Sequence, residues 1–375
     1  MKKIIGTIAL SLLFGSALLA QNRSVSFEHG TFAEALAKAK ENNKLIFFDG
    51  FTDWCGPCKY MANKVFTQDK VADFFNENFI NVKFDMEKGE GIELAKKYQV
   101  RAFPTFLLLD STGKLIHKIV GGDEADGFIE KVKEGLNPET SLAGKKDKYE
   151  SGKYDTEFVK GYLSTLQNAY METEAEEVAQ QYLRSLKENQ RVSKENWFVY
   201  KDFVNDPMSK DFIFILTNRL KFTDAVGDSS INAKINSVFT SKSLAYLANR
   251  RGKVYSQDEV AKLREFIKSS SVDNGAKYIA LLNMADVKAA KDGVLLSSQL
   301  QDFVKNNTLS DQECYSILSV TVPTIAENAS KTEWLAISAI IDGRIASLKE
   351  EKAKPYFERV KEQLSNKLND KKENQ

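Results

Sequence analysis

The chain has 375 residues, of which 42% are hydrophobic and 28% are charged. This composition excludes a disordered chain and a membrane-embedded one, and the length exceeds what one compact domain usually holds. Basic and acidic residues number 53 and 52, so the charge gives no reason to expect binding to nucleic acid or to an anionic membrane surface. We therefore expect an ordinary soluble protein of two domains.

The first twenty residues differ from the rest of the chain. Met1-Lys2-Lys3 is a short basic start, residues 4–19 are almost wholly apolar, and Ala20 ends the run. This order is typical of a cleaved secretory signal. A retained membrane anchor is the alternative, but the run is shorter than the ~20 residues of a span and no basic cluster follows it. We expect residues 1–20 to be removed on export, with no stable membrane insertion afterwards and a periplasmic location if the source is a Gram-negative bacterium.

Residues 21–137 alternate between strand and helix patterns. Short apolar or alternating runs predict strands, and apolar residues at three- and four-residue steps predict helices. The expected strands are 24–28, 45–48, 80–86, 105–109 and 115–120. The expected helices are 31–42, 58–66, 69–77, 91–98 and 123–136. Strands interleaved with helices indicate a central sheet covered on both faces.

The strand patterns end at Asn137-Pro138. Residues 138–150 are polar and lack periodicity, which predicts a linker. Residues 151–375 carry helical patterns joined by short polar turns and predict an all-helical domain of stacked hairpins. No motif recurs at a fixed period, so a tetratricopeptide-like arrangement and an irregular helical domain both remain open. The clearest helical segments are 158–170, 174–186, 231–247, 259–267, 277–290, 334–348 and 355–368.

The chain contains only three cysteines, Cys55, Cys58 and Cys314. An exported protein that used disulfides as structural staples would carry more of them, at wider spacing. Cys55-Gly56-Pro57-Cys58 follows an expected strand and opens an expected helix, which is the setting of a redox pair. Zinc binding is the main chemical alternative, but besides carboxylates the chain offers only Cys314 and two histidines to complete a site. We expect neither a metal nor another cofactor.

The position of the pair in the helix separates the roles of the two thiols. The unpaired N–H groups and the positive end of the helix dipole favour the thiolate of Cys55, the expected nucleophile. Cys58 lies one turn into the helix, faces the interior and can attack the mixed disulfide that Cys55 forms with a substrate. Trp54, directly before the nucleophile, is expected to contact substrate. Cys314 opens an expected helix, and single cysteines of this kind are commonly buried and inert.

The segment from about Asn43 to Gly122 resembles the thioredoxin superfamily over more than its four-residue motif. The resemblance implies that Asp49, at the end of the 45–48 strand, is a buried carboxylate that takes a proton from Cys58, and that Lys83 is its partner. A lone buried aspartate would also have a raised pKa on physical grounds alone, which suits a proton acceptor near neutral pH.

The same resemblance implies a substrate groove. Pro104, after Phe103, matches a cis-proline that faces the two sulfurs, and Gly121 lies where the family keeps small residues. A cis bond before Pro104 would let the Phe103 peptide present its N–H and C=O to an extended substrate. Gly56 and Pro57 are expected to contribute to the same surface. Phe103 is bulkier than the residue common at this place, so substrate preference does not carry over from the family.

The resemblance implies a thioredoxin-like α/β fold, with a central mixed sheet flanked by helices, ahead of the helical domain. The continuation Val65-Phe66-Thr67-Gln68-Asp69 is similar to exported reducing domains that receive electrons from a membrane transporter. Gly56-Pro57 adds no charge or histidine beside Cys55, which also favours a reductant. We expect an exported thiol–disulfide oxidoreductase that reduces protein disulfides, fed by a membrane-bound or soluble redox donor. The alternatives are a disulfide oxidase or isomerase, and a helical scaffold or client-binding protein with a thioredoxin-like docking domain.

Overall fold

The computed structural model describes residues 23–249, 255–270, 272–349 and 351–373. The expected signal at residues 1–20 lies outside this range. The chain divides into two compact units, the first ending at Val178 and the second beginning at Ala179. No helix in the described part of the chain is long and apolar enough to cross a membrane.

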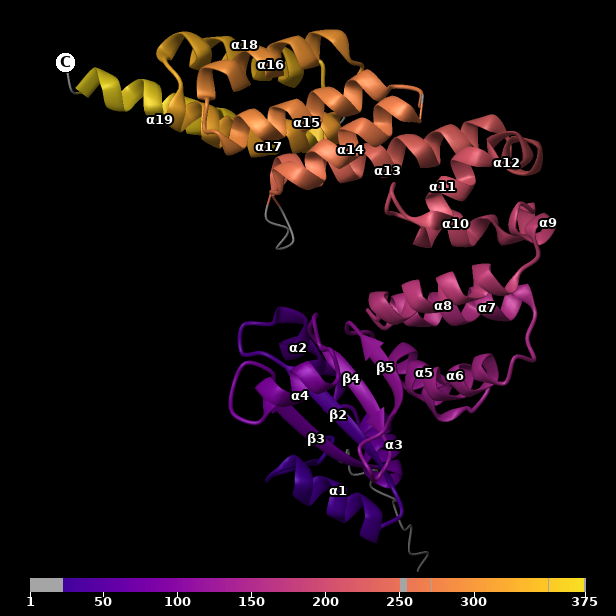
Figure 1. Ribbon diagram of the computed structural model, residues 1–375. Helices are drawn as coiled ribbons and strands as arrows, with labels where there is room; N and C mark the ends of the chain where they lie inside the picture. The colour runs from indigo at the N-terminus through magenta and orange to yellow at the C-terminus, as the bar shows by residue number, and fades with distance from the viewer. Residues whose placement is uncertain (1–22, 250–254, 271, 350, 374–375) are drawn as a thin grey trace, which may run out of the picture. The chain divides into compact units, whose positions relative to one another are not determined.

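A five-stranded mixed sheet forms the centre of the first unit (Figure 1). The strand order is β1-β3-β2-β4-β5; β3 runs parallel to β1 and β2, while β4 is antiparallel to both of its neighbours. The strands are β1 (Phe27–Glu28), β2 (Leu45–Phe51), β3 (Phe79–Asp85), β4 (Thr105–Leu109) and β5 (Leu115–Val120). The five expected strands are thus confirmed, with β1 shorter than its pattern indicated.

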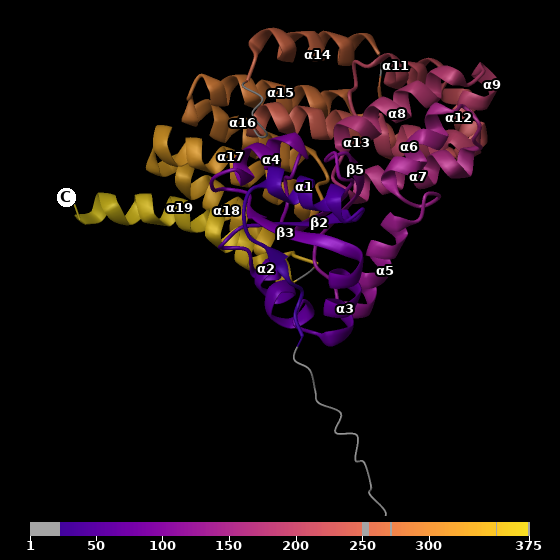
Figure 2. The ribbon, with the colours of Figure 1, turned by 90° about the horizontal axis from the view of Figure 1, so that it is seen from below.

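Helices cover both faces of this sheet (Figure 2). The alternation of side chains along β2 sends Phe47 to one face and Phe48 to the other. Phe47 packs in a cluster with aromatic rings of α3 and α5, and Phe48 packs with side chains of α1 and α4. The helices are α1 (Phe32–Glu41), α2 (Gly56–Tyr60), a π-helical turn (Met61–Val65), α3 (Asp69–Asn78), α4 (Gly91–Lys97) and α5 (Ala125–Leu136).

Three further helices follow the sheet: α6 (Leu142–Glu150), α7 (Thr156–Asn168) and α8 (Glu172–Ser185). The boundary between the two units falls within α8. The segment 138–150, expected to be a linker, is helical over most of its length, as α6. The hydroxyl of Ser141 accepts a hydrogen bond from the N–H of Gly144 and so caps this helix. Leu142 is its one buried side chain, which explains why the segment shows no apolar periodicity.

The second unit consists of helices, with no strand among its described residues. An all-helical region after the sheet is therefore confirmed, whereas a tetratricopeptide-like repeat remains a prediction. Helix α13 packs against α15, α15 against α16, and α16 against α17. The elements are α9 (Glu188–Arg191), η2 (Lys194–Asn196), α10 (Trp197–Phe203), α11 (Lys210–Thr217), α12 (Arg219–Val226), α13 (Asp228–Ala248), α14 (Gln257–Ser269), α15 (Gly275–Ala289), α16 (Gly293–Asn306), α17 (Asp311–Asn328), α18 (Lys331–Ala346), η3 (Glu351–Ala353) and α19 (Lys354–Glu373).

Candidate active site

Cys55 and Cys58 lie where the chain leaves the central strand β2 and enters α2. Cys55 is the N-cap residue of α2, and its sulfur accepts a hydrogen bond from the backbone N–H of Cys58 at 3.0 Å. The two sulfurs are joined in a disulfide with an S–S distance of 2.06 Å. The structure is therefore the oxidised form of the pair, with the Cys55 sulfur in the place where a helix stabilises negative charge.

The local sequence explains this start of a helix. Pro57 lies in the first turn, where its fixed φ suits a helix and its missing N–H costs no hydrogen bond. A side chain added at Gly56 would meet no atom within 4 Å, so the protein surface is open in front of the pair. The helix continues beyond Tyr60 as a π-helical turn to Val65, and π-turns inside helices are frequent at functional sites.

Both cysteines of the pair are buried. Cys55 is 2% exposed and Cys58 is 8% exposed in the oxidised form. We expected Cys58 to face the interior, and its burial agrees with that expectation. The position at the N-cap, rather than exposure, marks Cys55 as the candidate nucleophile.

Asp49 is a buried carboxyl group on β2, six residues before Cys55. Its Oδ1 atom has no hydrogen-bond partner within the described residues. Burial raises the pKa of Asp49 to about 7, and the positive charge of Lys83 opposes that rise. Asp49 is paired with Lys83 in the register of β2 and β3, although the Lys83 side chain is exposed and lies 5.4 Å from the ring of Phe27.

Thr52 is a residue of this region that the sequence did not single out. It is 1% exposed, and its Oγ1 atom is buried without a hydrogen-bond partner in the described structure. Its backbone carbonyl accepts a hydrogen bond from the N–H of Cys55 at 3.1 Å, which fixes the turn between β2 and the redox pair. A single threonine in a turn carries no pattern that would have predicted this burial.

Trp54 is 66% exposed beside the pair. Its indole N–H donates to the Glu87 carboxylate at 2.9 Å, and its ring meets that of Phe103 edge to face at 5.7 Å between centroids. An exposed indole held in one orientation is suited to contact an extended substrate. Glu87 is far away in sequence and adjoins no motif, so its role in holding Trp54 was not predictable.

The bond between Phe103 and Pro104 is cis, as the sequence predicted. Pro104 directly precedes β4, whose first residue Thr105 pairs with Gly50 near the end of β2. Because β2 and β4 are antiparallel, the proline loop before β4 and the redox pair after β2 lie at the same edge of the sheet. The N–H of Gly121 donates to the carbonyl of Pro104 at 2.9 Å, and Gly121 has φ of +90°, a conformation that favours glycine.

The loop after β5 also approaches the redox helix. A Cβ atom added to Gly122 would lie 3.1 Å from the sulfur of Met61 and 3.9 Å from the carbonyl oxygen of Pro57. The fold thus brings the loops that carry Gly121 and Pro104 and the loop at Gly122 toward one another and toward the redox helix. The Lys83 side chain is exposed on β3, although its residue pairs with Asp49. In the described part of the chain, no group of three or more His, Cys, Asp or Glu side chains is placed to hold a metal ion.

A central mixed sheet, a Cys-x-x-Cys disulfide at the start of a helix and a buried aspartate on the strand before it define a thioredoxin-like thiol–disulfide oxidoreductase domain. The family model of the thioredoxin-like domain matches residues 32–135. Through this domain the chain belongs to the thioredoxin family.

Relatives match the same part of the chain. A thioredoxin of Echinococcus granulosus is 37% identical over 92 residues, which span 24% of this chain and 79% of the relative. Chloroplastic thioredoxin Y of Oryza sativa is 32% identical over 122 residues, 32% of this chain and 66% of the relative. A protein disulfide-isomerase of Zea mays is 29% identical over 108 residues, only 20% of that protein. These relatives support thiol–disulfide oxidoreductase activity.

Among solved structures, a putative disulphide-isomerase from Bacteroides thetaiotaomicron is 47% identical. The match covers 32% of this chain and 98% of that one, with a TM-score of 0.30.

Replacing Asp49 with asparagine is expected to stabilise the oxidised protein at about pH 8 and to change little at about pH 4. The native carboxyl keeps its proton to about pH 7, whereas the unfolded carboxyl, with a pKa of 3.8, loses it earlier. The parent therefore loses stability as the pH rises between these values, by up to roughly 4 kcal/mol, and loses no more above them. Urea denaturation across this pH range measures the difference, with exposed Asp53→Asn as the control. A difference between parent and variant that is independent of pH would contradict this assignment.

Proposed function

We propose that the protein is an exported thiol–disulfide oxidoreductase that reduces protein disulfides through Cys55 and Cys58. The observation that carries the proposal is the pair itself, placed at the N-terminus of α2. The strand before it holds the buried carboxyl of Asp49, whose Oδ1 has no hydrogen-bond partner among the described residues. A domain kept only for docking has no physical need of paired sulfurs combined with a proton acceptor.

In the proposed reaction the reduced protein starts as the Cys55 thiolate. Its sulfur attacks one sulfur of a client disulfide; a mixed disulfide forms, and the second client sulfur leaves as a thiolate that takes up a proton. Cys58 then gives its proton to Asp49 and attacks the Cys55 sulfur, which restores the intramolecular disulfide and releases the first client sulfur as a thiolate. The client gains two electrons and the protein loses two.

A dithiol donor must then return two electrons to the pair. We propose a membrane-bound or soluble redox protein as this donor. The direction of flow rests on the absence of a histidine or a charged residue between the cysteines, which leaves the Cys55 thiolate stabilised mainly by the helix N-terminus. A moderately stabilised thiolate favours a reductant, whereas a strongly stabilised one favours an oxidant.

Trapping of clients tests the proposed reaction. A Cys58→Ala variant of the exported protein is expected to accumulate mixed disulfides on Cys55, because the thiol that resolves them is missing. Non-reducing electrophoresis and mass spectrometry would identify these adducts. The matched control is the double variant Cys55→Ala/Cys58→Ala; equal recovery of clients from the two variants would rule out the proposed cycle.

The reduction potential of the pair tests the direction of electron flow. Equilibration with dithiothreitol or glutathione buffers is expected to give about −270 mV, the potential of a reducing thioredoxin. A value of about −120 mV would reverse the proposal and make the protein a disulfide oxidase.

Export rests on the first twenty residues, where a basic start precedes an apolar run and a small residue. Mass spectrometry of the protein recovered from an exporting host is expected to show a mature N-terminus at Gln21. A chain that retains Met1 and stays with the cytoplasmic fraction would overturn this part of the proposal and leave the redox chemistry in place.

A further inference from the structure

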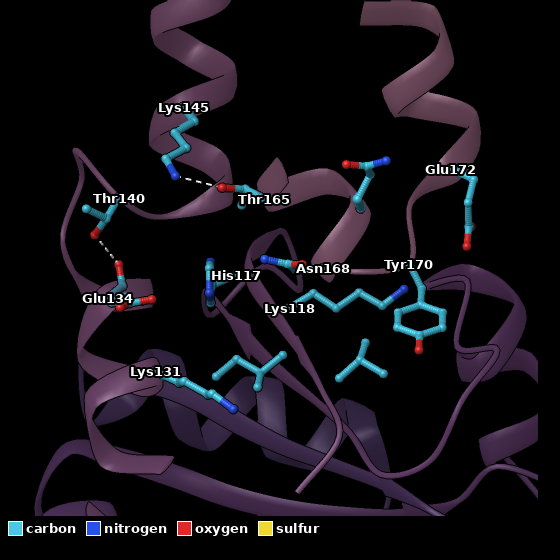
Figure 3. Close-up of a pocket in the computed structure, with 13 residues that line it drawn as sticks. His117, Lys118, Lys131, Glu134, Thr140, Lys145, Thr165, Asn168, Tyr170 and Glu172 are labelled. Atoms are coloured by element: carbon cyan, nitrogen blue, oxygen red, sulfur yellow. Dashed lines mark hydrogen bonds between the residues drawn. The ribbon is translucent and has the colours of Figure 1, made fainter. Parts of the chain in front are cut away.

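A pocket of about 860 Å³ lies in the first unit, away from the sulfurs, between β5 and the helices that follow it (Figure 3). Its floor is the run 117–120 of β5, and its walls come from α5, α6, α7 and the turn before α8. Small-molecule sites commonly have volumes of about 300–1,000 Å³, so the space suits a ligand rather than a single ion or water.

Three lysines from three different elements line this pocket: Lys118 of β5, Lys131 of α5 and Lys145 of α6. Lys131 is already paired, because its Nζ lies 2.7 Å from the carboxylate of Asp123. Lys118 and Lys145 have no carboxylate within ion-pair distance in the described structure, although Lys118 is buried and Lys145 is half-buried. Burial lowers the pKa of Lys118 to about 8 and lowers that of Lys145 as well.

The two unpaired lysines differ in what they already contact. Lys118 donates to the backbone carbonyls of Tyr98 and Gln99, at 3.3 and 2.8 Å, and so helps to cap the C-terminal end of α4. Lys145 has one neutral partner, the hydroxyl of Thr165 at 2.6 Å. Because an ammonium group has three donors, Lys145 keeps two for a ligand, and Figure 3 shows it pointing with Thr165 toward the pocket.

The acidic residues of the lining do not neutralise these lysines. Among the described residues, Glu134 and Glu172 are the acidic groups that line the pocket. Because Lys131 is balanced by Asp123, these two carboxylates face the charges of Lys118 and Lys145. Glu172 is shared with Arg101, whose guanidinium lies 3.5 Å from its carboxylate. Glu134 attracts Lys145 electrostatically but makes no ion pair with it in the described residues.

His117 adds a neutral donor rather than a charge. Its Nδ1 atom accepts a hydrogen bond from the N–H of Leu142 at 3.1 Å, so in the neutral ring the hydrogen resides on Nε2. Burial and the nearby Lys145 lower the pKa of His117 to about 4. Hydroxyl and amide groups of Thr140, Asn168 and other lining residues complete a surface richer in donors than in charged acceptors.

We infer that this pocket binds a small polar molecule that carries a carboxylate or phosphate group, with the oxyanion on Lys145 and Thr165. An oxyanion supplies the negative charge that Lys145 lacks and accepts the hydrogen bonds that its ammonium has left over. The rest of the pocket, with its hydroxyls and amides, selects a ligand that bears further polar groups. The site is separate from the redox pair, and the inference holds whichever way electrons flow there.

Titration calorimetry on the full mature chain in its oxidised form tests this site with two matched pairs of probes. Gluconate and glycerol 3-phosphate carry the two candidate oxyanions, and sorbitol and glycerol are their uncharged counterparts. Saturable binding of at least one anion, with a Kd below about 1 mM, and none of its uncharged counterpart is expected. Binding of gluconate indicates a carboxylate ligand, and binding of glycerol 3-phosphate a phosphate ligand.

Lys145→Gln is expected to weaken that binding about tenfold or more, because a charged donor is lost from a partly desolvated site. The control is Lys146→Gln on the same helix, since Lys146 is exposed and faces Glu150 outside the pocket. Equal affinity in the Lys145→Gln and Lys146→Gln variants would overturn the inference.

A measurement on the unaltered chain guards against a variant that fails to fold. Acetic anhydride labelling followed by mass spectrometry is expected to modify Lys145 more slowly when gluconate or glycerol 3-phosphate is present, with Lys146 unaffected. If neither anion protects Lys145 and neither binds with a Kd below about 1 mM, the pocket is not an oxyanion site.

Discussion

The pairing of β2 with β3 and β4 is the constraint on which the redox site depends. Because β2 lies between two other strands, its residues are fixed in register on both sides. That register sets Asp49 opposite Lys83 on one side and Gly50 opposite Thr105 on the other. The backbone hydrogen bonds of the sheet therefore fix the strand ends from which the disulfide and the proline loop extend. A one-residue slip would turn Asp49 to the opposite face.

The cost of this arrangement is concentrated in Asp49. Placing a carboxyl group among apolar side chains without a hydrogen-bond partner destabilises the fold whenever the group is ionised. Two layers of aromatic and aliphatic packing on either side of β2 offset that cost. The same burial that weakens the fold gives the carboxyl a pKa near neutrality, where it can exchange a proton with a thiol.

Sequence patterns predicted the sheet and the helices that cover it well, because these elements bury a face against one another. The helix after Thr31 and the 105–109 and 115–120 strands appear in the structure where the patterns placed them. The patterns failed for α6, which buries only Leu142, and for shorter helices of the second unit such as α10 and α11. Local periodicity requires a repeated buried face, and these segments have too few turns to show one.

Of the candidate site, the motif cysteines could be found from their local pattern, whereas the cis bond before Pro104 was implied by the resemblance to the thioredoxin superfamily. Thr52 and Glu87 could not, since their importance arises only from tertiary neighbours. The pocket beside β5 that Lys118, Lys131 and Lys145 line was likewise hidden, because its residues come from five separate elements, β5, α5, α6, α7 and α8.

The placement of the third cysteine has a consequence for how the protein matures. Both residues of the redox pair belong to the first unit, whose sheet is complete by Val120, whereas Cys314 lies in α17 of the second unit and is buried there. The cytosol keeps thiols reduced, so a chain that is exported as proposed meets an oxidising environment only after all three cysteines have been made. Folding of the second unit buries Cys314 and withdraws it from exchange, which leaves Cys55 and Cys58 as the pair that can oxidise.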